Sequence, residues 1–200
     1  NRSRTRASRR VVPSDAARTT LRSYVTRLRR SLADQLVVAG RDGGYALEVP
    51  NAAIDARRFE DLVRAAQRAI GARELATAQA RLREALALWR GAPFGDVAGL
   101  LSLDIEATRL EELHLHAVEM RMEVDLELGD SAVLVDELEA LVQRYPHRER
   151  LWRHLMLALY RAGRQADALA AYHRARVHLE EELGIDPGVE LQDLEAAILR

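Results

Sequence analysis

Residues 151–176 read LWRHLMLALYRAGRQADALAAYHRAR, two apolar runs that meet at Gly163. On both sides of this glycine the large apolar residues recur at steps of three and four, which is the spacing of an amphipathic helix. Small residues such as Ala168 and Ala175 allow two helices to approach closely. The segment therefore predicts a helical hairpin, and its expected core consists of Trp152, Leu155, Leu159, Tyr172 and Ala175.

The same pattern recurs 34 residues earlier, which is the period of the tetratricopeptide repeat. A shift of 34 places brings the key positions onto a matching glycine or apolar residue; the pairs are Gly163 with Gly129, Met156 with Met122, Ala168 with Leu134, Tyr172 with Leu138 and Ala175 with Leu141. Pro146 stands where such a repeat ends. We therefore expect a second helical hairpin before the first.

A weaker unit of this type precedes both hairpins, on apolar runs at 59–70 and 74–89. Its core positions are Leu62, Ala65, Ala66, Leu82 and Ala85, and Arg73 holds the turn position that glycine holds elsewhere. The insertion at 90–103 breaks the period, and we expect it to form a separate packed loop with Trp89 and Phe94. Further helices are expected at 104–128, 131–145, 149–162, 165–183 and 188–199.

The formal net charge of -1 hides a division of the chain near Pro50. Residues 1–50 carry eleven Arg and four acidic residues, whereas residues 51–200 carry nineteen Arg and twenty-seven acidic residues. A basic segment ahead of an acidic body indicates one part that binds a polyanion. Residues 1–17 contain five Arg and no apolar period, so we expect an arm or loop there.

Residues 18–32 predict an amphipathic helix, because Leu21, Val25, Leu28 and Leu32 fall on one stripe. Residues 36–49 hold two short strand-forming runs around the turn AGRDGG, the pattern of a β-hairpin. A basic helix followed by a hairpin is the arrangement of a winged helix, in which the helix enters the DNA major groove. The expected DNA contacts come from the polar face of the helix and from the hairpin tip: Thr19, Arg22, Ser23, Thr26, Arg27, Arg30 and Arg41. The alternative is an ordinary amphipathic helix with an arginine-rich surface.

The residues indicate no enzyme, no metal site and no cofactor. No catalytic carboxylate pair, nucleophile with its base or phosphate-binding loop stands out, and the chain has no cysteine. The six histidines lack zinc-site spacing and are expected on helix surfaces. The acidic runs at 111–112 and 180–182 are expected to be solvated helix faces, with an acidic surface for a partner as the alternative. No stretch is long and apolar enough to span a membrane and no secretory leader is visible, so we expect a cytoplasmic protein.

Two parts of the chain resemble a known family of bacterial regulators. Residues 20–32, TLRSYVTRLRRSL, and 37–49, VVAGRDGGYALEV, are similar to the recognition helix and wing of the OmpR/PhoB-type winged-helix domain. Residues 54–200 resemble the bacterial transcriptional activation domain of the SARP family, the antibiotic regulatory proteins of actinomycetes, and of the larger AfsR-like regulators. The strings that carry this second resemblance are DARRFEDLV (55–63), LREALALWRG (82–91), ATRLEELHLHAVEMR (107–121), LMLALYRAGRQADALAAYHRAR (155–176) and EELGIDPGVELQDLEAAIL (181–199).

The expected fold is mainly α: a C-terminal tetratricopeptide-like helical-repeat domain at 54–200, preceded by a partial winged helix at 1–50. The resemblance implies a transcriptional activator that binds repeated elements in double-stranded promoter DNA, usually as a homodimer, and contacts RNA polymerase. Helix 18–32 and wing 36–49 are the parts expected to bind DNA. The alternative function is a helical-repeat protein-interaction scaffold with a vestigial DNA-binding segment.

The winged-helix resemblance begins unusually close to the start of this sequence. An OmpR/PhoB-type domain has a sheet and two helices ahead of the recognition helix, whereas seventeen residues precede Arg18. We therefore expect a fragment of a longer regulator, a gene product whose start has been lost or misplaced, or a relic that keeps the activation domain alone. DNA binding by these 200 residues is expected to be salt-sensitive and weakly specific.

Overall fold

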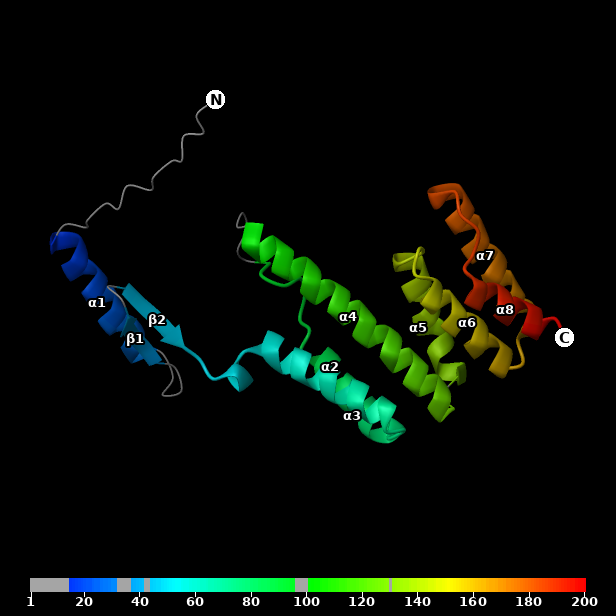
Figure 1. Ribbon diagram of the computed structural model, residues 1–200, viewed down its shortest axis with the longest axis horizontal. Coiled ribbons are helices and arrows are strands. Elements are labelled where there is room, and N and C mark those ends of the chain that lie inside the picture. Colours follow the sequence, from blue (N-terminus) through cyan, green and yellow to red (C-terminus); the bar gives the residue numbers. More distant parts are fainter. Residues whose placement is uncertain (1–14, 32–36, 42–43, 96–100, 130) are drawn as a thin grey trace, which may run out of the picture. The chain divides into compact units, whose positions relative to one another are not determined.

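A computed structural model describes residues 15–31, 37–41, 44–95, 101–129 and 131–200 (Figure 1). The chain divides into two compact units, of which the first ends at Ile54 and the second begins at Asp55. The described residues are mainly α-helical, with one two-stranded antiparallel hairpin. The expectation of a mainly α protein with a small hairpin is therefore confirmed.

Unit one contains helix α1 (Asp15–Ser31), strands β1 (Val37–Arg41) and β2 (Gly44–Glu48), and the short 3-10 helix η1 (Asn51–Ala53). The strands pair with Val37 opposite Glu48 and Arg41 opposite Gly44. The centre of the predicted turn, at 42–43, lies outside the described residues, as does most of the expected arm at 1–17. The prediction of an arm or loop is wrong for residues 15–17, which are helical, because Ala16 and Ala17 are strong helix formers.

Unit two is built from helices alone in the part of the chain that the structure describes. They are α2 (Asp55–Gly71), α3 (Leu75–Ala87), α4 (Leu101–Leu128), α5 (Ser131–Arg144), α6 (Glu149–Arg161), α7 (Gln165–Leu183) and α8 (Val189–Ile198). Most ends fall within one to three residues of the predicted ones, because glycine and proline mark them in the sequence. Along the chain, α2 packs on α3, α3 on α4, α5 on α6 and α6 on α7 (Figure 1).

Helix α4 joins two hydrophobic clusters of unit two. One of its sides packs against α2 and α3 through Ala117, Met120 and Val124. Another side contributes to the cluster formed with α5 to α8, through Leu115, Val118, Met122 and Leu126. A helix that is apolar on several sides has no single stripe to follow in the sequence. Its inner position is therefore a consequence of packing that periodicity alone does not reveal.

The turn of each helical hairpin contains a residue with a positive φ angle. Arg73, Gly129 and Gly163 all have positive φ angles, of 59°, 101° and 75°. Arg73 N donates to the carbonyl oxygen three residues back at 2.9 Å, and Gly163 N makes the same bond at 2.9 Å. The residue after each one bonds a carbonyl oxygen five residues back, again at 2.9 Å. Arg73 therefore does occupy the turn position that glycine holds in the later hairpin.

The predicted hairpin core is confirmed. The five residues expected inside it are all buried: Trp152, Leu155, Leu159, Tyr172 and Ala175. Of the apolar residues paired with this hairpin one repeat earlier, Met122, Leu134 and Leu138 are buried and Leu141 is partly buried. In the first hairpin Leu62, Ala66, Leu82 and Ala85 are buried, and Ala65 is half-buried.

Three expectations about unit two are wrong. Trp89 does not belong to a separate loop core. The centre of its ring lies 5.6 Å from that of Phe59 on α2 and 4.2 Å from that of His114 on α4, on which it stacks. Helix α4 also begins at Leu101, inside the expected loop, and residues 96–100 lie outside the described residues. The expectation that all histidines lie on helix surfaces fails at His154, which is buried in α6. Its helix is covered on several sides by other helices.

Candidate nucleic-acid interface

Helix α1 presents one polar face, which carries hydroxyl and arginine side chains. At 100° per residue, Thr19, Ser23, Thr26 and Arg30 lie opposite Leu21, with Arg22 and Arg27 beside them. All six of these predicted site residues are exposed in unit one. Such a row offers hydrogen-bond donors and acceptors of different reach, which is the chemistry needed to contact base edges and phosphates.

The hydroxyl hydrogens on this helix are partly engaged with its own backbone. The Thr26 hydroxyl donates to the carbonyl oxygen of Arg22 at 2.9 Å. Its oxygen still faces outward as an acceptor, because the bond uses the hydrogen and leaves lone pairs available. The arginines are therefore the main donors of the polar face.

Arg29 has a different role, which the sequence reasoning missed. Its Nε and Nη2 donate to the carbonyl oxygen of Val38 on β1, at 3.1 and 2.6 Å. This bond fixes the hairpin to the helix and takes the guanidinium away from the polar face. The available signal was its position 80° from Leu21, nearer to the apolar stripe than any predicted contact residue.

The hairpin follows the helix in the order that a winged helix requires. Arg41, the predicted wing contact, is the last residue of β1 and pairs with Gly44 across the turn. Its backbone is therefore at the hairpin tip, as predicted. The structure brings the six helix residues onto one face, and it leaves the role of Arg41 in DNA contact as a prediction.

The apolar side of α1 is only partly covered within the described part of unit one. Val25 of α1 and Val38 of β1 are buried. Leu21 and Leu28 of α1 are about half exposed, at 49% and 51%. Tyr24 and Leu47 are also exposed. Leu32, the last residue of the predicted stripe, lies outside the described residues. The small core explains why Arg29 matters for the position of the hairpin.

The acidic runs of unit two lie at the surface, as predicted for solvated helix faces. Glu111 and Glu112 are exposed, and so are the residues at 180–182. Glu112 accepts a hydrogen bond from Arg148, and His147 Nε2 lies 2.5 Å from Glu182 Oε2. Among the described residues, no group of three metal-binding side chains comes together and no helix is long and apolar enough to cross a membrane.

Comparison with known proteins identifies the larger unit. Residues 54–199 match the family described as the bacterial transcriptional activator domain. The regulatory protein DnrI of Streptomyces peucetius is 41% identical over 198 residues, which cover 94% of this chain and 73% of that protein. The regulatory protein AfsR of Streptomyces griseus is 43% identical over 188 residues, again 94% of this chain but 19% of the relative.

A solved structure shows the same fold. Mycobacterium tuberculosis EmbR, in complex with a low affinity phosphopeptide, superposes with a TM-score of 0.80 at 35% identity. The match covers 94% of this chain and 51% of that one, so this chain spans about half of EmbR. The relatives are named as transcriptional regulators and not as enzymes, which supports the prediction that the chain is no enzyme. The chain thus belongs to the SARP/AfsR-like family of transcriptional regulators, whose bacterial transcriptional activator domain it carries at residues 54–199.

Proposed function

We propose that this regulator is a DNA-binding transcriptional activator in which α1 reads promoter DNA and the β1–β2 hairpin serves as a wing. The observation that carries the proposal is the exposed polar face of α1, held beside its hairpin by the bond from Arg29 to Val38. A helix with this face fits the major groove, where arginine recognises guanine and contacts phosphates. Unit one is then a partial winged helix.

The helical hairpins of unit two form the activating part in this proposal. Their repeated positive-φ turns and small-residue core positions support a tetratricopeptide-like repeat. We propose RNA polymerase as the protein partner and a homodimer on promoter repeats, as the resemblance implies. Since the target is chromosomal DNA, the proposed place of action is the bacterial cytoplasm.

Weak specificity is part of the proposal. Leu21 and Leu28 of the helix are half exposed in the described part of unit one, where Val25 is buried and Arg29 bonds the hairpin. A helix that is loosely held presents its base-contacting side chains less rigidly, and phosphate contacts then dominate binding. The affinity is therefore expected to fall steeply with salt, with only a modest preference for promoter DNA.

The test compares two arginine pairs in the full chain. Arg27→Ala with Arg30→Ala removes two guanidinium groups from the polar face of α1. Arg164→Ala with Arg176→Ala removes two exposed ones from α7 and its preceding turn, as the matched control. Binding to duplexes from the promoters beside the gene is measured by fluorescence anisotropy, with random duplex as competitor. The α1 pair should weaken promoter binding about tenfold or more, since each bidentate base contact is worth roughly 1–3 kcal/mol.

Folding should not change in either pair, because all four side chains are exposed. Equal promoter binding by the α1 pair and the control pair would refute the role of α1. A footprint of the full-length gene product on the same promoters checks the location of the contact.

The second candidate function is the protein-interaction scaffold. It is favoured by a groove of about 970 Å³ in unit two, lined by residues of α4, α6 and α8 such as Glu123, Arg153 and Leu194. A groove between repeat helices is a common place for a partner peptide. Absence of any DNA footprint from the full-length product would favour this candidate over the activator.

A further inference from the structure

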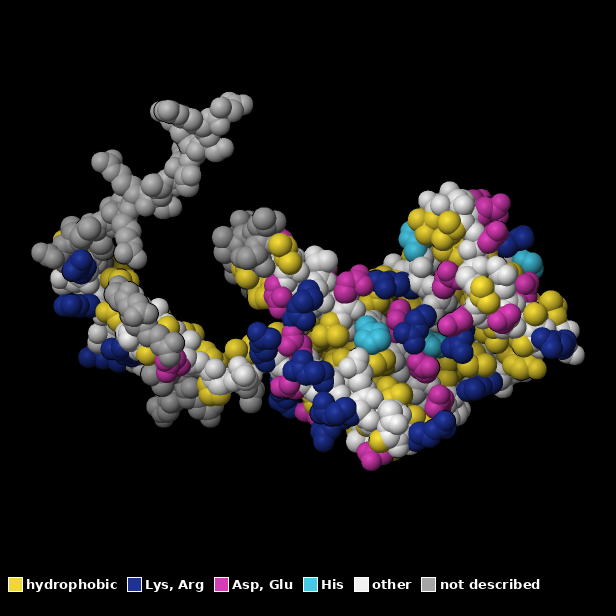
Figure 2. Space-filling view, in the orientation of Figure 1, with side chains coloured by type: hydrophobic (Ala, Val, Ile, Leu, Met, Phe, Trp, Pro, Cys, Tyr) yellow, Lys and Arg dark blue, Asp and Glu magenta, His cyan; other side chains and the backbone are white. Residues whose placement is uncertain are grey.

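The charge of unit two is divided as unevenly as that of the whole chain. Residues 55–90, which include α2 and α3, carry eight Arg and five acidic residues, whereas residues 91–200 carry eleven Arg and twenty-two acidic residues. Figure 2 shows arginine side chains gathered over α2 and α3. The basic character therefore continues beyond Pro50 into the first hairpin of the activator domain.

Helix α2 carries a row of arginines on the side opposite its packed face. Arg57, Arg64 and Arg68 follow each other at steps of seven and four residues, which places them on one stripe. The side chains of Arg57 and Arg64 are 58% and 55% exposed, and Arg68 is exposed as well. At 1.5 Å per residue the row extends over about 16 Å of the helix. We call these three residues the α2 arginine row.

When Arg109 of α4 is counted with the row, four guanidinium groups lie near three carboxylates. Glu60 is buried, and its Oε2 lies 3.2 Å from Arg57 Nη1 and 3.9 Å from Arg64 Nη1. Its other oxygen accepts a hydrogen bond from Arg109 of α4. The buried carboxylate of Glu60 is thus shared among three guanidinium groups. Two exposed acids also lie nearby among the described residues: Asp61, 2.5 Å from Arg64, and Glu106, 2.7 Å from Arg109.

The shape of this surface suits an extended anion. A groove of about 380 Å³ between α2 and α4 is lined by three arginines, Arg57, Arg64 and Arg109, and by two acids, Glu60 and Glu106. The exposed stripe itself is polar, so it lacks the apolar anchors that a protein partner uses for most of its binding energy. Evenly repeated phosphates need no such anchors, because guanidinium groups bind them through charge and hydrogen bonds alone.

We propose that the α2 arginine row contacts the phosphates of the duplex DNA that the same chain binds. The inference rests on the proposed function, because the duplex is the one held by α1. Both surfaces belong to one chain, so DNA bound at the first raises the phosphate concentration at the second. The row adds affinity without base recognition, since phosphate contacts carry no sequence information.

The experiment measures binding of the full chain to a random-sequence duplex between about 50 and 200 mM NaCl. Arg64→Ala with Arg68→Ala removes two members of the row. Arg164→Ala with Arg176→Ala is the control, because Arg164 matches Arg64 in exposure, 53% against 55%, and also pairs with an acid three residues away. The row variant should bind more weakly, and the slope of log affinity against log salt should become shallower by about 2. The control should keep the wild-type slope.

The α1 pair Arg27→Ala with Arg30→Ala separates this inference from the proposed function. The row variant is expected to keep the wild-type ratio of promoter to random binding, whereas the α1 pair is expected to reduce it. A row variant with wild-type affinity and slope overturns the inference even if the α1 pair loses promoter preference. The reverse result, an effect of the row and none of the α1 pair, supports the row and overturns the proposed reading helix. A chain that binds no duplex at 50 mM salt overturns both.

Discussion

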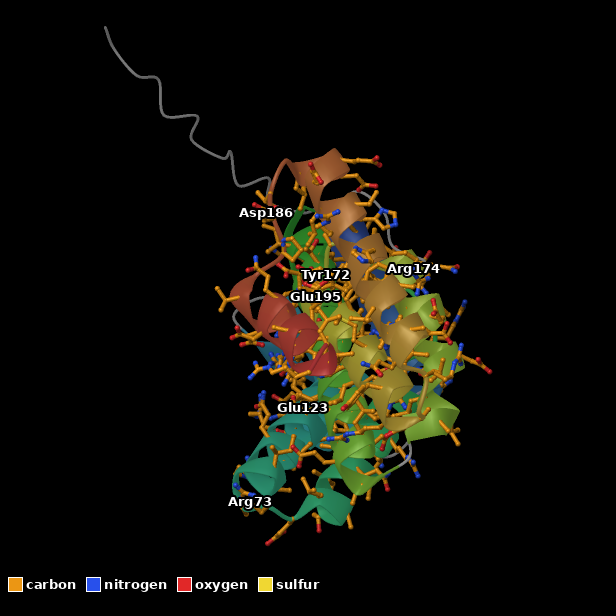
Figure 3. All side chains as sticks on the ribbon, turned by 90° about the vertical axis from the view of Figure 1, so that its right-hand side faces the viewer. Arg73, Glu123, Tyr172, Arg174, Asp186 and Glu195 are labelled. Atoms are coloured by element: carbon orange, nitrogen blue, oxygen red, sulfur yellow. The ribbon has the colours of Figure 1, made fainter. Side chains whose placement is uncertain are left out.

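At the scale of single residues, Arg73 and Gly163 show one backbone position filled by two different residue types. Both turns have positive φ and the same pair of hydrogen bonds back into the preceding helix. Figure 3 places Arg73 at the end of the α2–α3 hairpin. Glycine adopts this conformation without steric cost, whereas an L-residue with a side chain does so at roughly 1–2 kcal/mol. The first hairpin therefore carries backbone strain that the third does not.

This difference predicts opposite effects of two substitutions on the free energy of unfolding. Arg73→Gly should raise it by about 0.5–1 kcal/mol, because relief of strain exceeds the entropy that glycine adds to the unfolded chain. Gly163→Ala should lower it by about 1 kcal/mol, since φ there is 75°. Urea denaturation of the full chain measures both.

Gly71 provides the control for the glycine substitution. It ends α2 without positive φ, and an added Cβ would meet nothing within 4 Å. Gly71→Ala should therefore leave stability unchanged or slightly higher. Destabilisation by Arg73→Gly would contradict the assignment of strain to this turn.

At the scale of elements, α5, α6 and α7 are fixed to one another through Trp152. Its Nε1 donates to the carbonyl oxygen of Pro146 at 2.8 Å, just beyond the end of α5. The guanidinium of Arg174 on α7 lies 5.3 Å from the centre of its ring and makes two 2.9 Å bonds to Glu139 of α5. A buried indole with its N–H satisfied combines apolar packing with a specific orientation.

Trp152→Ala should therefore lower the free energy of unfolding by about 3 kcal/mol or more, because it leaves a large cavity and an unpaired carbonyl oxygen. Tyr160→Ala on the same helix is the control, since this ring is 45% exposed and its loss should cost little. Chemical denaturation compares the two variants. A neutral Trp152→Ala would mean that the indole contributes nothing to the hairpin core.

The last two helices are joined by a polar contact inside an apolar interface. Tyr172 of α7 and Glu195 of α8 lie beside each other in Figure 3. Burial raises the pKa of Tyr172, and the negative charge of Glu195 raises it further. The phenol therefore stays protonated next to the Glu195 carboxylate. This contact helps to orient α8 on the repeat, where Leu191 and Ile198 are buried.

At the scale of the whole molecule, the two units differ in how their cores are made. In the described part of unit one, Val25 and Val38 are buried and Arg29 bonds the Val38 carbonyl oxygen, whereas unit two has two large clusters joined by α4. Within unit two, His154 of α6 is 1% exposed and both of its ring nitrogens lack a hydrogen-bond partner among the described residues. Burial lowers the pKa of His154 to about 4, with a smaller effect from the charge of Arg153.

The stability of unit two should consequently fall in mild acid. The unfolded chain takes up a proton at His154 near its ordinary pKa of 6.5, whereas the folded chain does so only near 4. Between these values the unfolded state binds more protons, so the free energy of unfolding drops as pH falls, by about 2 kcal/mol at pH 5 and about 3 kcal/mol below pH 4.

Urea denaturation at pH 7.5 and pH 5 measures this loss. His154→Phe should remove most of the pH dependence, because the aromatic ring remains and the titrating group is gone. His173→Phe, on the exposed side of α7, should keep the wild-type dependence. An unchanged pH dependence in His154→Phe would show that other groups are responsible.

Much of the fold and of the candidate site could be predicted from local pattern. The hairpin of α6 and α7, its repeat one period earlier and the polar face of α1 all follow from helical spacing, because that spacing depends on residues three and four apart. The turn at Arg73 was also found, since its place in the repeat specifies the backbone even without glycine. The role of Arg29 was missed, because a side chain bonding a carbonyl oxygen nine residues away leaves no periodic signal.

The sequence by itself determined the helices, their turns and the membership of the family, since these depend on local spacing and on long matching strings. Only the tertiary structure decided that α4 would join two cores and that Glu60 would be shared among three arginines. It also decided that His154 would be buried with no hydrogen-bond partner among the described residues. These outcomes depend on which distant elements pack together. Burial and charge pairing are properties of that packing, and no single segment of the chain contains them.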